Sequence, residues 1–113
     1  MTEEYSDEID SQYHLMIQWT DIDNKHPLDD IVDVHVRFNN GNEYYATFMT
    51  PRSLENQFKK NAKTGECLAG TYFCMRANPV FVSALEEKNI KRTIDDLMQN
   101  QEFDNHFRLL PKD

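Results

Sequence analysis

Apolar and polar side chains alternate strictly along residues 31–38, and a second extended run follows at 42–49. Between the two runs stands Asn40-Gly41, the dipeptide that most often closes a β-hairpin, because both residues tolerate a positive φ. Val32, Val34 and Val36 therefore share one face of the first strand. This hairpin constrains the fold more than any other feature of the chain, because it requires an antiparallel sheet with one apolar face.

Two registers of the hairpin are compatible with its turn residues. A two-residue turn at Asn40-Gly41 pairs Val36 with Tyr45. A three-residue loop, with Gly41 in the left-handed bulge position, pairs Val36 with Tyr44 instead. We prefer the second register, because it makes one face continuously apolar and gives the other face a pair of opposite charges.

Capping signals place two helices after the hairpin. Thr50 is suited to the N-cap of the first, with Pro51 at its first position. Ser83 and Glu86 match a capping box for the second. The other expected elements are a strand at 14–19, a polar loop at 20–30, a first helix over 51–62, strands at 71–75 and 80–83, a second helix to about residue 100 and a short helix from Phe103.

The predicted order is therefore βββ-α-ββ-α. Hairpin-length connections favour a mostly antiparallel sheet of about five strands. Apolar residues at 54, 58 and 62, and again at 90, 94, 97 and 98, give each helix an apolar stripe. We expect an α+β fold in which both helices pack on one face of the sheet.

Negative charge is concentrated at the start of the chain. Residues 1–33 carry ten acids and one base, whereas residues 34–113 carry ten acids and eleven bases. The first eleven residues predict a flexible acidic tail, followed by a single domain over 12–113. The acidic start is unlike a signal peptide, and no apolar run is long enough to span a membrane. We expect a cytoplasmic protein with free thiols.

Catalytic and metal-binding motifs are weak. The segment Asp21-Ile22-Asp23-Asn24 begins like a calcium loop, but later ligand positions hold Lys25, His26 and Val32. The four histidines lack metal-ligand spacing, although His14 and His35 would approach each other on neighbouring strands. Cys67 lies near Lys60 and Lys63 in sequence, a mildly favourable setting for a thiolate. We predict no cofactor and no metal site.

The acids between residues 21 and 33 are the best candidates for partner binding, because they lie where the ordered sheet begins. A fixed negative surface suits a basic protein partner, while the overall acidity disfavours nucleic acid. Trp19 would supply an aromatic anchor beside them. The predicted partner-binding residues are Asp21, Asp23, Asp29, Asp30, Asp33 and Trp19.

Three segments carry a resemblance: Glu43 to Thr50, Thr64 to Phe73, and Thr93 to Leu97 with Glu102-Phe103 after it. Together they resemble a group of small, acidic, uncharacterised bacterial proteins, similar in size and charge to the immunity proteins encoded beside bacterial toxins. Small size, acidity and the absence of catalytic motifs, together with this resemblance, favour a non-enzymatic inhibitor of a basic toxin. Two alternatives remain: a small ligand-binding domain or enzyme using Cys67 or a histidine, and a homo-oligomeric structural protein. The oligomeric state is left open between monomer and homodimer.

Overall fold

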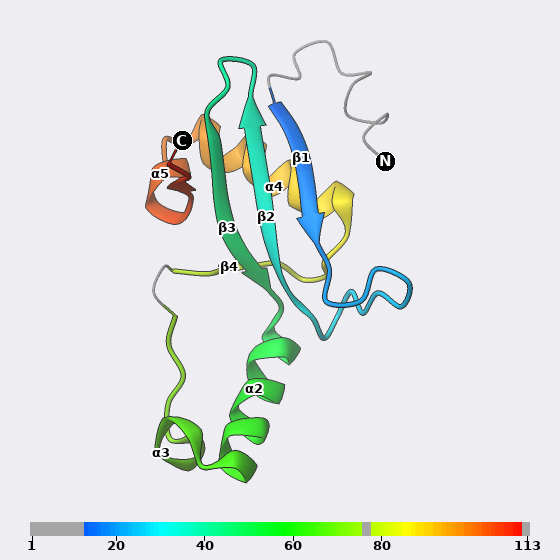
Figure 1. The fold of residues 1–113 in the computed structure, drawn as a ribbon, viewed down its shortest axis with the longest axis vertical. Helices are drawn as coiled ribbons and strands as arrows, with labels where there is room; N and C mark the ends of the chain where they lie inside the picture. Colours follow the sequence, from blue (N-terminus) through cyan, green and yellow to red (C-terminus); the bar gives the residue numbers. More distant parts are fainter. Residues whose placement is uncertain (1–12, 76–77, 112–113) are drawn as a thin grey trace.

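A mostly antiparallel sheet, in which only the pairing of β3 with β4 is parallel among the described strands, forms the centre of the molecule, and helix α4 runs across one of its faces (Figure 1). The computed structural model describes residues 13–75 and 78–111, so the predicted acidic tail over 1–11 lies outside the described residues. The sheet order is β1-β2-β3-β4, with β5 also paired to β3. The elements are β1 (Tyr13–Gln18), β2 (Ile31–Phe38), β3 (Glu43–Met49), α2 (Pro51–Thr64), α3 (Glu66–Gly70), β4 (Val80–Phe81), α4 (Glu87–Gln99), α5 (Phe103–His106) and β5 (Arg108–Leu109).

The predicted α+β class, the five-stranded sheet and the hairpin register are confirmed. Val36 lies opposite Tyr44 and Arg37 opposite Glu43, as the three-residue loop requires. Gly41 has a φ of 93°, the left-handed conformation that a bulge position needs. The apolar pattern of the sequence therefore decides which face of the sheet becomes the core.

The core lies between this apolar sheet face and the helices α4 and α5. Val34, Val36 and Phe48 are fully buried, as are Ile90 and Ile94 of α4. Phe103 of α5 and Phe107, the C-cap residue of α5, complete the packing. Their rings stack with centroids 4.3 Å apart. The predicted apolar stripe of the second helix is present in this packing, with Leu97 and Met98 partly buried against the core.

A polar network joins the edge strand β1 to α4. The Tyr13 hydroxyl donates to Asp95 Oδ1 over 2.6 Å, and Lys91 Nζ donates to Asp95 Oδ2 over 2.6 Å. The Lys91 ammonium also lies 4.9 Å from the centroid of the Tyr13 ring. Since only 7% of the Lys91 side chain is exposed, this carboxylate compensates a charge that is largely removed from water.

The position of α2 differs from our expectation: α2 does not lie on the sheet but projects beyond its end (Figure 1). Only Thr50 separates the last residue of β3 from the first residue of α2, and a reversal onto the sheet needs a longer connection. Thr50 is the N-cap, as predicted, and its hydroxyl accepts from the Ser53 amide. The Thr50 hydroxyl also donates to the Leu28 carbonyl, and Ser53 Oγ donates to the Asp30 carbonyl, so the base of α2 is fixed to the preceding loop.

Two smaller predictions around the later strands are wrong. Residues 71–75 form no strand, because they run back along α2, away from the sheet (Figure 1). Ser83 does not cap α4, whose N-cap is Glu86. The amides of Val82 and Leu85 instead donate to the carbonyls of Met49 and Pro27, and the Glu86 amide donates to the Ala84 carbonyl, so the chain bends at residues 83 and 84 before α4 begins.

The turn α3 packs closely against α2 and contains an unusual backbone. Cys67, Leu68 and Ala69 all have φ between 53° and 55°, so this turn is left-handed. L-residues pay roughly 1–2 kcal/mol each for that conformation. A Cβ added at Gly70 would lie 2.8 Å from the Phe58 carbonyl oxygen and 3.0 Å from the Ala62 nitrogen. Gly70 is therefore the position at which α3 contacts the backbone of α2.

We expect Gly70→Ala to release this contact and to destabilise the protein by about 2 kcal/mol. Alanine at this position would have to adopt a positive φ, and its Cβ would clash with the backbone of α2. Gly65→Ala is the matched control: its φ is 86°, but nothing lies within 4 Å of an added Cβ, so its cost should be about 1 kcal/mol. Urea denaturation and amide exchange in α2 measure both variants. Equal effects in the two variants would contradict the close approach.

Candidate protein-binding surface

The polar loop between β1 and β2 is held in one conformation by Asp30. The Asp30 carboxylate accepts hydrogen bonds from the Thr20 hydroxyl over 2.7 Å, the Thr20 amide over 3.3 Å and the Ile31 amide over 2.8 Å. These bonds close the loop at its two ends. The role of Asp30 is therefore structural, and its carboxylate is already engaged by its own chain.

The five predicted aspartates differ in position and in what their carboxylates contact. Asp33 lies on the sheet, where its Oδ1 accepts from the Thr47 hydroxyl over 3.0 Å. Asp21, Asp23 and Asp29 lie on the exposed part of the loop. Asp21 accepts from the Asp23 amide over 3.1 Å, and Asp29 lies 3.7 Å from Arg52 of α2. Only these last three present carboxylates at the surface of the loop.

Trp19 stands beside these acids in a shallow hollow between β1 and the start of α4. Its ring is half-buried against the core, and Lys25 Nζ lies 5.3 Å from the ring centroid. The hollow is lined by Leu15, Met16, Ile17, Trp19, Ile22, Lys25, Pro27, Leu85, Glu86 and Glu87. Ile22 is 67% exposed, so the apolar lining continues onto the outer surface.

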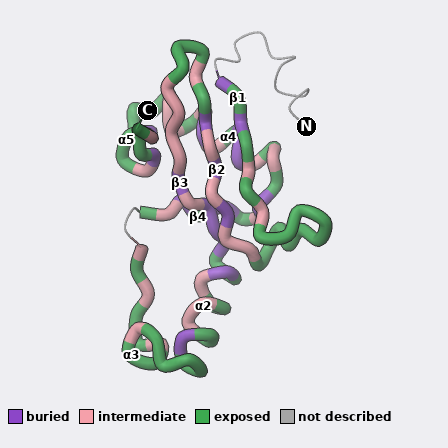
Figure 2. The backbone as a smooth tube through the Cα atoms, viewed as in Figure 1, coloured by how far each residue is buried: buried purple, intermediate pink, exposed green. Residues whose placement is uncertain are grey.

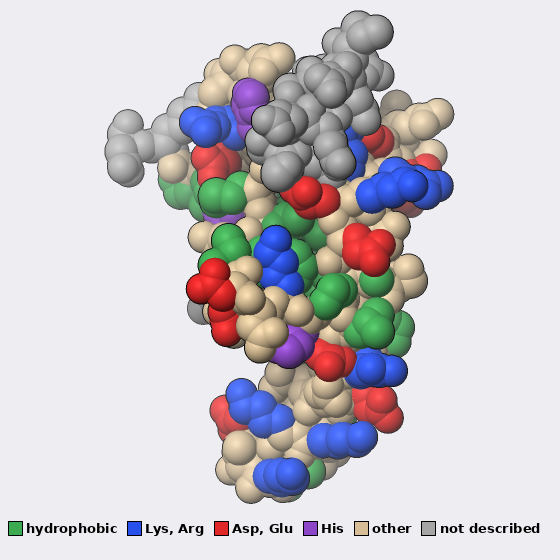
Figure 3. All heavy atoms as spheres, turned by 90° about the vertical axis from the view of Figure 1, so that its right-hand side faces the viewer, with side chains coloured by type: hydrophobic (Ala, Val, Ile, Leu, Met, Phe, Trp, Pro, Cys, Tyr) green, Lys and Arg blue, Asp and Glu red, His purple; other side chains and the backbone are tan. Residues whose placement is uncertain are grey.

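We call the surface formed by Trp19, Ile22, Lys25 and Pro27 with Asp21, Asp23, Asp29, Glu86 and Glu87 the loop surface. Figure 3 shows this side of the molecule, where hydrophobic side chains gather at mid-height among carboxylates. The sequence indicated Trp19 and the aspartates, but not the contribution of Ile22 and Pro27. Glu86 and Glu87 were also missed, because they join the loop surface only through packing of the segment before α4.

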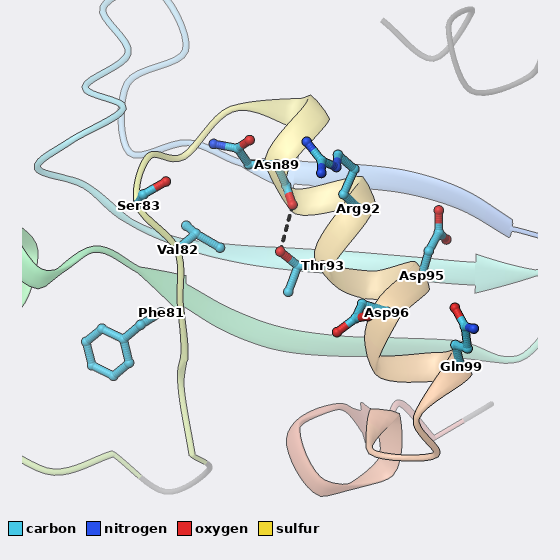
Figure 4. Close-up of a pocket in the computed structure, with 9 residues that line it drawn as sticks. All are labelled: Phe81, Val82, Ser83, Asn89, Arg92, Thr93, Asp95, Asp96 and Gln99. Carbon is cyan, nitrogen blue, oxygen red and sulfur yellow. Dashed lines mark hydrogen bonds between the residues drawn. The ribbon is translucent and has the colours of Figure 1, made fainter.

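A second hollow lies on α4 and the preceding segment (Figure 4). It is lined by Phe81, Val82, Ser83, Asn89, Arg92, Thr93, Asp95, Asp96 and Gln99. The polar groups are largely occupied by their own chain: Asp95 binds Lys91 and Tyr13, Asp96 accepts from Asn100, and Thr93 donates to the Asn89 carbonyl. None of the predicted partner-binding residues lies here.

The histidines considered as metal ligands lie on the face of the sheet opposite the core. His14 and His35 are on neighbouring strands, and His35 Nδ1 lies 3.1 Å from Glu43 Oε2. The His35 ring also stacks on Tyr45, with centroids 6.2 Å apart. Within residues 13–75 and 78–111, no three His, Cys, Asp or Glu side chains are grouped so that they could hold a metal ion.

The two cysteines lie away from both the sheet and the loop surface. Cys67 is half-buried in the left-handed turn α3, and Cys74 is exposed on the segment that returns from it. Both thiols are free. The structure therefore places Cys67 on a strained turn and leaves the hypothesis of a reactive thiol as a prediction.

Comparison with known proteins found no match: no family model, no curated protein and no solved structure is similar to the chain. Among the described residues, no helix is both long and apolar enough to cross a membrane. The interpretation of the loop surface therefore depends on its own geometry and charge.

Proposed function

We propose that the protein is a non-enzymatic binding protein of the cytoplasm that inhibits a basic protein partner, most concretely as an immunity-type inhibitor of a bacterial toxin. The observation that carries this proposal is the composition of the loop surface. Exposed and half-buried apolar side chains, with Trp19 among them, share the hollow with Glu86 and Glu87, and the exposed Asp21 and Asp23 flank Ile22 in the chain. An apolar centre with a charged border is typical of protein interfaces.

The carboxylates give this surface a preference for basic partners. Opposite charges raise the rate of encounter and select the partner more than they increase affinity. Trp19 supplies rigid contact area, a property of residues that dominate binding energy. A small protein with this surface can cover a basic active site without any chemistry of its own.

The test is co-expression with the product of the adjacent gene, since an inhibitor is often encoded beside its target. We expect a stable complex and protection of the host cell. Replacing Asp21, Asp23 and Asp29 by Asn should lower the association rate about tenfold at low salt and weaken its salt dependence. Asp30 is left unchanged, because its carboxylate closes the loop.

Two controls test whether the change in association rate comes from the loop surface. Glu102→Gln combined with Asp104→Asn removes charge from exposed positions at the start of α5, outside the loop surface, and should leave association unchanged. Deletion of residues 1–11 should weaken binding less than neutralising the loop. If the Asp21, Asp23 and Asp29 variant binds and protects like the wild type, the loop surface is not the binding site.

A further inference from the structure

The arm, which we define as residues 51–75, has almost no core of its own. Figure 2 shows it beyond the end of the sheet, with little buried surface. Within these residues, all of which the structure describes, only Ser53 and Asn61 are buried, and both are polar. Leu68 is 73% exposed and Tyr72 47% exposed. Since helices in proteins gain most of their stability by packing an apolar face, the arm has surface available for a partner.

The arm also differs in charge from the rest of the chain. It carries Arg52, Lys59, Lys60 and Lys63 against Glu55 and Glu66, a net charge of +2. Because the whole chain carries −8, the remainder carries −10. At 3.6 residues per turn, positions 52, 59 and 63 fall on one side of α2. Figure 3 shows Lys and Arg side chains gathered around this lower end of the molecule.

A surface that complements the arm exists on the same chain. The loop surface combines the exposed Ile22 with Asp21, Asp23 and Asp29, and Leu28 beside it is 45% exposed. Within one molecule only the base of the arm reaches this surface, through Arg52 and Asp29, since the rest of α2 projects away from the sheet (Figure 1). A second copy can supply it.

We propose that two copies of this chain form a reciprocal dimer in which the arm of each copy docks on the loop surface of the other. The base of α2 is fixed to the loop, because Arg52 lies 3.7 Å from Asp29 and Ser53 bonds the Asp30 carbonyl. A two-fold axis near this base brings each arm to the opposite loop, so the contact is made twice and the assembly closes. A contact between two loop surfaces would instead bring like charges together.

This inference goes beyond the proposed function and does not depend on it. A dimer of this kind covers the loop surface, so a basic partner must displace the arm of the second copy. The arm then acts as an internal competitor for the site. Variants that remove the arm's charge without touching the loop separate the two proposals.

The experiment is sedimentation velocity of the full chain at about 0.05 M and about 0.5 M salt, where charge screening differs strongly. We expect a dimer at low salt that dissociates at high salt. Lys59→Glu with Lys63→Glu, and separately Asp21→Lys with Asp23→Lys, should each raise the dimer dissociation constant at least about tenfold. An equal mixture of the two variants should restore a heterodimer, because both arm–loop contacts are again between opposite charges.

Lys88→Glu with Arg92→Glu is the matched control, since it makes the same charge change at exposed positions of α4 and should still dimerise. Circular dichroism confirms that each variant is folded. A wild-type monomer at low salt, or dimers that persist in both reversal variants, would overturn the proposal. The Lys59, Lys63 variant keeps its loop surface, so failure of that variant to bind the adjacent-gene product would count against the proposed function and not against the dimer.

Discussion

Replacing Phe48 by Ala should lower the free energy of unfolding by about 3–5 kcal/mol, the largest effect that we expect from a single substitution. Phe48 is fully buried at the centre of the core face, and its ring meets Phe107 edge-on with centroids 6.0 Å apart. Truncation removes this contact and leaves a cavity between β3 and the C-terminal segment, whose walls are fixed by the sheet and by α4. Chemical denaturation of the two proteins measures the difference.

Phe81→Ala provides the matched control for Phe48. It removes the same side chain from another strand, but Phe81 is 47% exposed, so its loss should cost less than about 1 kcal/mol. Similar destabilisation by the two variants would mean that the core is not between the sheet and α4. Such a result would contradict the fold itself.

Replacing Asp95 by Asn should lower the free energy of unfolding by about 3 kcal/mol, because the Lys91 ammonium is nearly buried and loses a carboxylate that lies 2.6 Å away. The side chain of Asp95 is 45% exposed, which keeps this cost below that of a fully buried ion pair. The variant also weakens the hydrogen bond from Tyr13, so β1 should separate from α4 first. Amide exchange in β1, measured together with urea denaturation, detects both effects.

Asp96→Asn is the control for Asp95→Asn. It tests whether the loss of stability comes from the contacts of Asp95 or only from the loss of one negative charge on α4. Asp96 is the next residue on α4, is exposed and accepts a 3.2 Å bond from Asn100, so its loss should cost less than about 0.5 kcal/mol. Combining Asp95→Asn with Lys91→Met should recover much of the lost stability, since a buried ammonium is then replaced by an apolar side chain. Failure of this recovery would show that Lys91 is not the cause.

Local patterns predicted the hairpin closely. The period-two alternation and the position of Gly41 were sufficient for its register, because a slip by one residue would turn every valine of β2 toward solvent. The buried positions of α4 followed from their 3.6-residue spacing in the same way. The N-cap at Thr50 is also a local feature, and this prediction is confirmed.

The position of α2 and the composition of the loop surface could not be read in this way. The stripe at 54, 58 and 62 predicted packing on the sheet, but the connection at Thr50 is too short for α2 to fold back. The carboxylates of Asp21 and Asp30 looked alike in the sequence, yet one is exposed and the other closes the loop. Glu86 reaches the loop surface only because Leu85 bonds the Pro27 carbonyl.

The sequence by itself thus determined the antiparallel hairpin, the apolar face of the sheet and the helix that covers it, because those features depend on side-chain period and on neighbouring residues. Only the tertiary structure decided that the arm projects from the sheet and that Trp19, Ile22 and Glu86 share one surface. These arrangements depend on contacts between residues far apart in the chain, whose geometry no local pattern specifies.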